Sequence, residues 1–238
     1  MRENQDKQNK IILKLLKDKS VMKQNVFNNT IDVFKLIKEI LRERADELGD
    51  NAKKIDKRLG IEFKDHSAQS MNIKIAGDVL DFFMHTNVFE FENTHPMFKT
   101  GYIKENSLNS YCGIIHVYNF LSDSYKYNRL NDLGYLIARI FINQEKKFFI
   151  ETKTQIGHKY MNFSDEPINK DVLSEIINEL IIFAIMFDLY TPPYDAVRQV
   201  SVYELQEKQS SSALRTGKRL GYFGRDTDSG TSDEFNLL

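Results

Sequence analysis

The sequence predicts an α+β fold: a mixed, mainly antiparallel central sheet, packed by a long amphipathic N-terminal helix and a buried C-terminal helix. Three patterns predict it. Apolar residues recur every three or four positions over residues 27–48, β-branched and aromatic residues dominate residues 61–163, and a nearly continuous apolar helical pattern covers residues 171–189. With 17 Phe and 11 Tyr against 4 Pro and 11 Gly, the 238-residue chain has enough apolar surface to form a core.

The N-terminal part carries two helical patterns. Residues 10–23 place aliphatic side chains among lysines, and residues 27–48 form a broader stripe with charged residues opposite. The stripe is too short for a sustained coiled-coil repeat, so it must be covered by the chain's own sheet or by a second copy of the helix. We expect the chain's own sheet to cover it.

The centre of the chain reads as strands. We expect strands at residues 61–64 and 71–76, and favour a strand over residues 78–91, where aromatic residues are densest. Residues 93–109 contain the turn formers His95-Pro96 and Gly101 and are expected to form a loop. Residues 111–118 fit either a strand or the start of a helix.

The clearest β pattern is an antiparallel hairpin. Residues 134–143 (GYLIARIFIN) and 147–154 (KFFIETKT) are joined by a polar turn. A further strand is expected over residues 158–163, a helix buried on nearly all sides over residues 171–189, and a last edge strand around Val200 and Val202. The organisation is therefore a helical part (1–60), an α+β core (61–208) and a flexible tail (209–238).

The formal net charge of -1 conceals an uneven distribution of charge. Lys and Arg outnumber Asp and Glu by 15 to 10 in residues 1–60, whereas the acids lead by 18 to 13 in residues 61–200. The last 38 residues divide again: residues 201–225 contain five basic and two acidic residues, and residues 226–238 contain four acidic residues and no basic one. This distribution argues against a wholly basic nucleic-acid binder and leaves local electrostatic contacts open at both ends.

Several functional classes are excluded or disfavoured. A single cysteine, Cys112, rules out an internal disulfide or a cysteine-rich zinc site and favours a reducing cytoplasm. No secretory signal pattern is present, and the longest apolar run has eight residues, far below the roughly 20 needed to cross a bilayer. The common phosphate-binding loops and the nucleophile elbow are also missing, and Cys112 reads as a buried thiol.

One pattern suggests catalysis. Asp132 precedes one hairpin strand, and Glu151 and Lys153 alternate on the other, so both acids could bind one Mg²⁺ or Mn²⁺ while the lysine stabilises developing phosphate charge. In the strand pair and spacing, this resembles the PD-(D/E)xK nuclease superfamily, although Asn131 stands where proline is usual. The resemblance implies a metal-dependent nuclease or phosphodiesterase. The alternative, which we favour, is an ordinary charged face on a half-exposed hairpin.

The histidines give no comparable pattern. His66, His85, His95, His116 and His158 include no close metal-binding pair. Asp81 and His85 fall on one side of either a helix or a strand, and His95 follows after a turn, so a carboxylate–histidine site is conceivable. Structural histidines are the simpler interpretation.

The tail is the candidate partner-binding segment. Its basic part alternates bases, glycines and aromatics, which suits phosphate attraction and stacking, and its acidic end finishes with apolar residues that suit a groove on a partner. The acidic end could also shield the basic part. The residues that we expect to contact a partner are Lys218, Arg219, Tyr222, Phe223, Phe235, Leu237 and Leu238.

The leading hypothesis is therefore a cytoplasmic, non-enzymatic interaction or scaffold protein. We expect it to contact a protein partner, or a nucleic acid through the basic tail segment, without a cofactor. Self-association through the stripe of residues 27–48 is a further possibility. The alternative is the metal-dependent nuclease or phosphodiesterase built on Asp132, Glu151 and Lys153.

Overall fold

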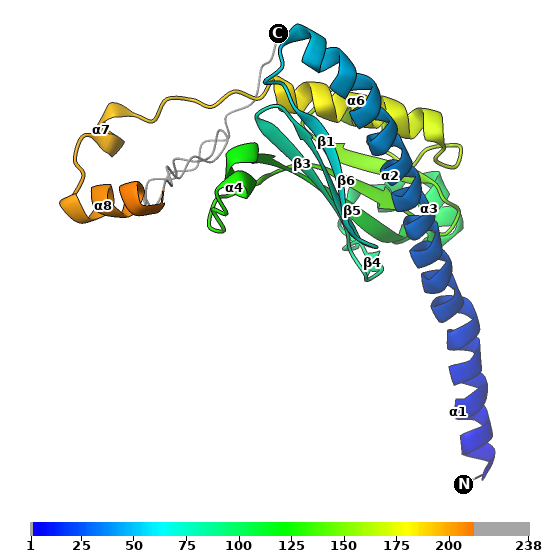
Figure 1. The fold of residues 1–238 in the computed structure, drawn as a ribbon. Helices are drawn as coiled ribbons and strands as arrows, with labels where there is room; N and C mark the ends of the chain where they lie inside the picture. The colour runs from blue at the N-terminus through cyan, green and yellow to red at the C-terminus, as the bar shows by residue number, and fades with distance from the viewer. Residues whose placement is uncertain (1, 212–238) are drawn as a thin grey trace.

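The computed structural model describes residues 2–211 and confirms the α+β class. A helical rod made of α1 (Arg2–Leu15), a π-helical turn η1 (Leu16–Ser20) and α2 (Val21–Ile55) leads into a seven-stranded antiparallel sheet. Figure 1 shows α2 lying along the sheet and α1 extending beyond it. The two sequence patterns at 10–23 and 27–48 thus belong to one rod, which packs on the body from Met22 onward.

The sheet has the strand order β1-β2-β3-β5-β6-β7. Its strands are β1 (Ile61–Ser67), β2 (Ser70–Ile75), β3 (Asp78–Met84), β5 (Tyr111–Leu121), β6 (Tyr135–Ile142) and β7 (Phe148–Thr152). The short β4 (Phe89–Glu90) pairs with β5 beyond the end of β3. The predicted strands at 61–64 and 71–76 and the hairpin are confirmed, and residues 111–118 are strand rather than helix. The strand predicted over residues 78–91 is broken after Met84 into β3 and the short β4.

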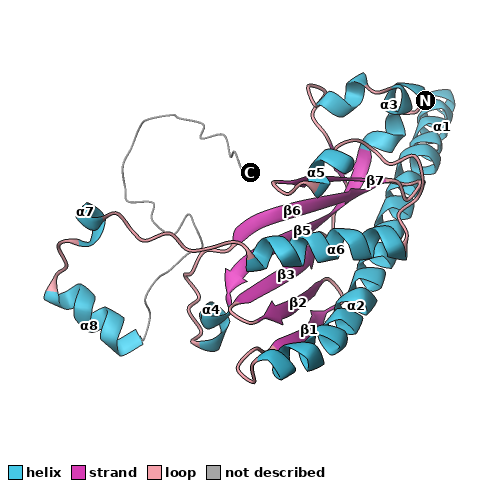
Figure 2. Ribbon diagram, turned by 90° about the horizontal axis from the view of Figure 1, so that it is seen from above, coloured by secondary structure: helices cyan, strands magenta, loops and turns pink. Residues whose placement is uncertain are grey.

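Two helices cover one face of the sheet. α2 and α6 (Lys170–Ile185) lie over the same face in Figure 2. Phe34, Ile37 and Leu41 of α2 and Leu173 and Leu180 of α6 are at most 1% exposed in the main core. The buried side of the 27–48 stripe is therefore covered by the chain's own sheet and α6, as expected, while Phe27, Ile31 and Leu48 stay half-buried.

The opposite face is covered mainly at its β5–β7 end, with α4 (Ser122–Lys126) adding a smaller contact through Tyr125. A second cluster joins Ile114, Phe141 and Phe149 of these strands to Met97 and Ile103 of the segment before β5. That segment, predicted as a loop, contains three short helices: η2 (Pro96–Lys99), α3 (Gly101–Glu105) and η3 (Ser107–Ser110). The prediction missed them because each is only four or five residues long and has no apolar repeat to mark it.

Other predictions at the C-terminal side were wrong. Residues 158–163 are not a strand: α5 (Ile156–Lys159) occupies their start, although the Ile150 amide still donates to the Tyr160 carbonyl at 2.8 Å. The helix predicted at 171–189 ends at Ile185, and its last turns are not buried all round, since Ile182 is 49% and Met186 72% exposed. Its sheet-facing side stays buried as far as Ala184 and Phe187, which stacks on Tyr135 of β6, so the exposed residues lie on the outer side of the helix, where no second layer covers them.

The end of the described chain is helical rather than extended. α7 (Tyr194–Val197) and α8 (Val202–Ser211) replace the expected edge strand around Val200 and Val202, and they lie apart from the sheet in Figure 1. No sheet edge is near them to pair with an extended segment. Residues 212–238 lie outside the description, and within residues 2–211 no helix has both the length and the apolar character to cross a membrane.

One buried polar side chain marks a weak point of the core. Asn119 on β5 is fully buried, and neither its amide nitrogen nor its amide oxygen has a hydrogen-bond partner among the described residues. Burying an unpaired amide costs free energy that an apolar side chain of similar size avoids. We therefore expect Asn119→Leu to raise the free energy of unfolding by about 1–2 kcal/mol, measured by urea denaturation. An unchanged or lower value would contradict this.

Candidate functional site

Asp132 is held within its own loop. It lies between α4 (Ser122–Lys126) and β6, and its carboxylate is 2% exposed. Its Oδ2 accepts a hydrogen bond from Ser124 Oγ at 2.6 Å and lies 3.8 Å from Arg129 Nη1. These contacts tie the turn before β6 together.

Glu151 and Lys153 lie at the other strand of the hairpin. Glu151 on β7 is the register partner of Arg139 on β6, and its carboxylate accepts a hydrogen bond from the Arg139 guanidinium. His95 approaches the other carboxylate oxygen of Glu151, at 3.8 Å. Lys153 follows the strand and forms no ion pair with any described carboxylate.

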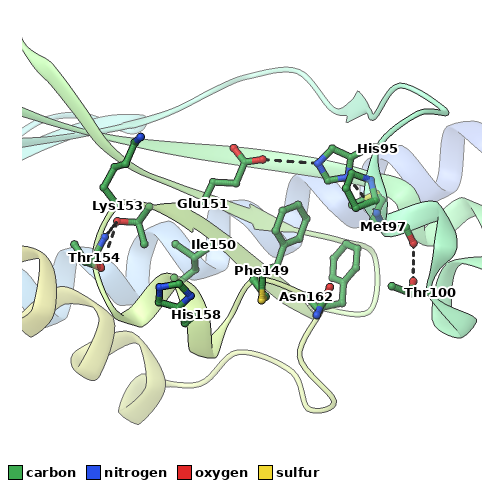
Figure 3. A pocket seen from close by; sticks show the side chains of 15 residues that line it. His95, Met97, Thr100, Phe149, Ile150, Glu151, Lys153, Thr154, His158 and Asn162 are labelled. Atoms are coloured by element: carbon green, nitrogen blue, oxygen red, sulfur yellow. Dashed lines mark hydrogen bonds and ion pairs between the residues drawn. The ribbon is translucent and has the colours of Figure 1, made fainter. Parts of the chain in front are cut away.

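Glu151, Lys153 and His95 line one cavity of about 560 Å³, whereas Asp132 is not part of its wall. Figure 3 shows Lys153 and His158 toward one end, His95 at the other, and Phe149 and Ile150 between them. The hairpin thus brings two of the three predicted catalytic residues together and leaves the third elsewhere. Within residues 2–211, no group of three or more His, Cys, Asp or Glu side chains is arranged to hold a metal ion.

The chain builds the cavity from three segments. β7 forms its floor, the η2 segment carries His95 on one side, and α5 with the following turn closes the other. His95 caps η2, since its Nδ1 accepts a hydrogen bond from the Met97 amide, and this orients the ring. α5 approaches β7 closely because residue 157 is glycine: a Cβ there would lie 3.0 Å from the Thr152 carbonyl oxygen.

The open face of the sheet carries a separate polar network. Asp81 on β3 accepts a hydrogen bond from the Tyr125 hydroxyl at 2.9 Å and another from Asn72. Asn72 also lies 2.8 Å from His66. Burial raises the pKa of the Asp81 carboxyl above its ordinary value, against the opposing effect of these hydrogen bonds.

The partners of the predicted carboxylate–histidine pair differ from the expectation. His85 follows β3, where its ring contacts Phe83 and Phe89 and its Nδ1 accepts a hydrogen bond from the Asn87 amide. Asp81 uses Tyr125 and Asn72 instead. Sequence spacing could not reveal these partners, because Tyr125 comes from α4, 44 residues along the chain.

The raised pKa of Asp81 predicts a pH effect on stability. A carboxyl whose pKa is higher in the folded state favours folding when protonated, and this contribution is lost as the pH rises through the folded pKa. Asp81→Asn should therefore be more stable than the unmodified protein at pH 7, and the difference should shrink as the pH falls toward 3.8. Urea denaturation at both pH values measures this, with Asp46→Asn on the exposed side of α2 as control.

A second candidate site is the projecting helix. From residue 4 to residue 20, every side chain is exposed, including Ile11, Ile12, Leu15 and Leu16, each more than half exposed. These four lie on one side because their spacing follows the helical repeat. Toward the body, the helix has a shallow hollow of about 280 Å³ that is lined by Ile12, Leu15, Leu16 and Ser20 and bordered by Lys19 and Lys23.

The exposed apolar side of the projecting helix continues into a buried apolar side farther along the rod. Met22 and Val26, one and two turns beyond the hollow, are buried against Tyr111 of β5. Lys19 lies over the Tyr111 ring at 5.1 Å, and Lys23 at 5.8 Å. The apolar side of the rod is therefore covered as far as Met22 and loses its cover toward the N-terminus.

The predicted partner-binding residues of the tail, from Lys218 to Leu238, lie outside the described residues. No known protein family, curated protein or solved structure matches the chain.

Proposed function

We propose that this protein is a non-enzymatic binding protein that captures a partner protein on its projecting helix. The supporting observation is that residues 4–20 form a helix on which every side chain is exposed, with four aliphatic side chains on one side and only Lys19, at its end, contacting the body through Tyr111. A helix of this length is only marginally stable in water by itself, and clustered apolar surface favours association. A partner would supply the missing cover, as in helix-in-groove recognition.

The charge on the helix indicates the chemistry of the partner. Residues 2–20 contain six basic residues (Arg2, Lys7, Lys10, Lys14, Lys17, Lys19) and three acidic ones (Glu3, Asp6, Asp18). We infer an acidic partner segment whose apolar side chains enter the hollow beside Lys19 and Lys23. A second copy of the same helix fits less well, because it would bring these lysines together.

The proposal also includes a role for the tail in binding and a cytoplasmic location for the protein. The acidic and basic parts of residues 209–238 would add a second contact, and a cytoplasmic location accords with a single, buried cysteine. Deleting residues 210–238 should weaken partner binding. Unchanged binding would remove the tail from the proposal and leave the helix in place.

A photo-crosslinking amino acid at position 12 tests the helix directly. In cells of the source organism, full-length protein labelled at Ile12 should form a discrete adduct with an acidic protein, identified by mass spectrometry, whereas a label at exposed Lys53 near the end of α2 should not. Adducts of identical intensity at both positions would contradict the proposal. A homodimer adduct would replace the partner with a second copy, and cosedimentation with anionic vesicles would replace it with a membrane surface.

A metal-dependent phosphodiesterase is the second candidate. Its support is that Glu151 and Lys153 share one cavity with His95 and His158. Because Asp132 is outside the cavity wall, this candidate has a single carboxylate, Glu151, in the cavity. Hydrolysis of nucleic acid in Mg²⁺ or Mn²⁺ that is lost in Glu151→Ala but kept in Glu105→Ala would favour it; activity unaffected by Glu151→Ala would remove it.

A further inference from the structure

The cavity beside β7 has an apolar floor and two polar ends. Phe149 and Phe163 meet edge to face with their centroids 5.0 Å apart, and Met97, 6% exposed, lies on the side of η2. The volume of about 560 Å³ is in the range of small-molecule sites, which combine apolar walls with a few convergent polar groups. The floor is therefore suited to the apolar part of a ligand.

The charges around the cavity do not cancel. Glu151 is neutralised by Arg139, with His95 beside its second oxygen. Lys153 has no anionic partner among the described residues, and His158, at the same end in Figure 3, is not hydrogen-bonded through its ring to any described residue. One positive charge and one imidazole are thus left to meet a ligand.

The wall that carries His158 is built to stay close to the strand. Gly157 lets α5 contact the end of β7 at Thr152, where an added Cβ would lie only 3.0 Å from the Thr152 carbonyl oxygen and methyl group. Lys159 next to it is held by Glu175, whose carboxylate accepts hydrogen bonds from its ammonium group at 2.6 Å and 2.7 Å. Lys159 is therefore engaged elsewhere, and Lys153 is the cation of the cavity.

We infer that this cavity binds a small organic anion, with its acidic head at Lys153 and His158 and its apolar part over Phe149 and Met97. A cationic ligand would meet Lys153 unfavourably, and a neutral one would leave it unpaired. The inferred site is independent of the projecting helix, so either can fail without the other. A carboxylate and a phosphate monoester share the required chemistry, and separate probes distinguish them.

The test is an NMR titration of the full-length, ¹⁵N-labelled protein. The probes are phenylacetate and phenyl phosphate, with 2-phenylethanol and 2-phenylethylamine as neutral and cationic comparators. Amides of residues 149–163 should shift with at least one anion at millimolar concentration. The dissociation constant of that anion should be about tenfold lower than that of the alcohol, because the alcohol cannot form the charge-assisted contact. The stronger of the two anions identifies the head group.

Variants locate the binding. Lys153→Met should reduce affinity for the anion to that for the alcohol, and His158→Gln should reduce it by a smaller factor, while Lys104→Met on exposed α3 should leave it within twofold. Both cavity positions lie at the surface, so the variants are expected to stay folded, which the spectra themselves report. Equal binding of all four probes, no shift with either anion, or equal losses in the Lys153 and Lys104 variants would each overturn the inference.

Discussion

Phe34→Ala should lower the free energy of unfolding by about 3–5 kcal/mol, the largest loss expected from any single truncation in α2. Phe34 is 1% exposed and lies in the main core between the helix and the sheet. Removing its ring takes away the burial of a large apolar surface and leaves a cavity that the rigid strands cannot fill. Urea denaturation followed by far-ultraviolet circular dichroism measures the loss.

Phe83→Ala is the matched control for Phe34. Phe83 is also a phenylalanine, on β3, and its ring contacts His85. It faces the open side of the sheet, however, and is 42% exposed. The same truncation there should lower the free energy of unfolding by less than about 1.5 kcal/mol, because less of the ring leaves water on folding and its removal leaves no enclosed cavity. Equal losses for both variants would contradict the assignment of α2 to the covered face.

Gly113→Ala should lower the free energy of unfolding by about 3 kcal/mol, because the added methyl group overpacks the core instead of leaving a cavity. A Cβ at this position of β5 would lie 2.0 Å from Thr30 Oγ1 and 2.9 Å from Thr30 Cβ, so α2 would have to move away from the sheet. Thr30 is 1% exposed, and its hydroxyl donates to the Val26 carbonyl at 2.7 Å, so it cannot simply turn aside. The same urea denaturation measures this loss.

Two further variants separate the crowding from a general effect of losing glycine. Gly77→Ala should be neutral or slightly stabilising, since no atom lies within 4 Å of the added Cβ and its φ is not positive. Combining Gly113→Ala with Thr30→Ala should restore part of the loss, because the Thr30 hydroxyl and methyl are then absent. A purely additive double variant would show that Thr30 is not the source of the strain.

The long N-terminal helix was predicted correctly because one of its faces is buried. The 27–48 stripe has a clear repeat since one side contacts the core and the other contacts solvent, whereas the strand over residues 78–91 was inferred from its aromatic density. Strands β5 to β7 are covered on both faces at one end, which turns them into nearly continuous apolar runs. That is why residues 111–118 left strand and helix equally open.

The errors have physical causes as well. α6 was expected to be buried all round because its composition is apolar, but only one of its sides faces the sheet, and Ile182 and Met186 lie on the other, solvent side. The helix α8 was read as a strand because the short β-branched run around Val200 and Val202 fits both structures. Residues 158–163 were read as a strand although they contain no β-branched residue, and α5, with only four residues, has no helical repeat to reveal it.

The candidate site was predictable only in part. Alternation in the hairpin placed Glu151 and Lys153 on one strand face, and both line the cavity. Their neighbours could not be anticipated: Arg139 depends on the strand register, and His95 arrives from a segment 56 residues earlier in the chain. Asp132 lies outside the cavity because it accepts a hydrogen bond from Ser124 within its own loop, and sequence spacing does not reveal that hydrogen bond.

The central claim, that the projecting helix is the docking element, is tested most directly by titrating the crosslinked partner into two full-length variants. Leu15→Asp places a charge in the apolar side of the helix, whereas Leu13→Asp, also exposed, lies on another side. We predict that Leu15→Asp weakens binding by about 10- to 100-fold, since burial of a leucine is lost, and that Leu13→Asp changes it less than about threefold. Equal affinities for the two variants would contradict the account.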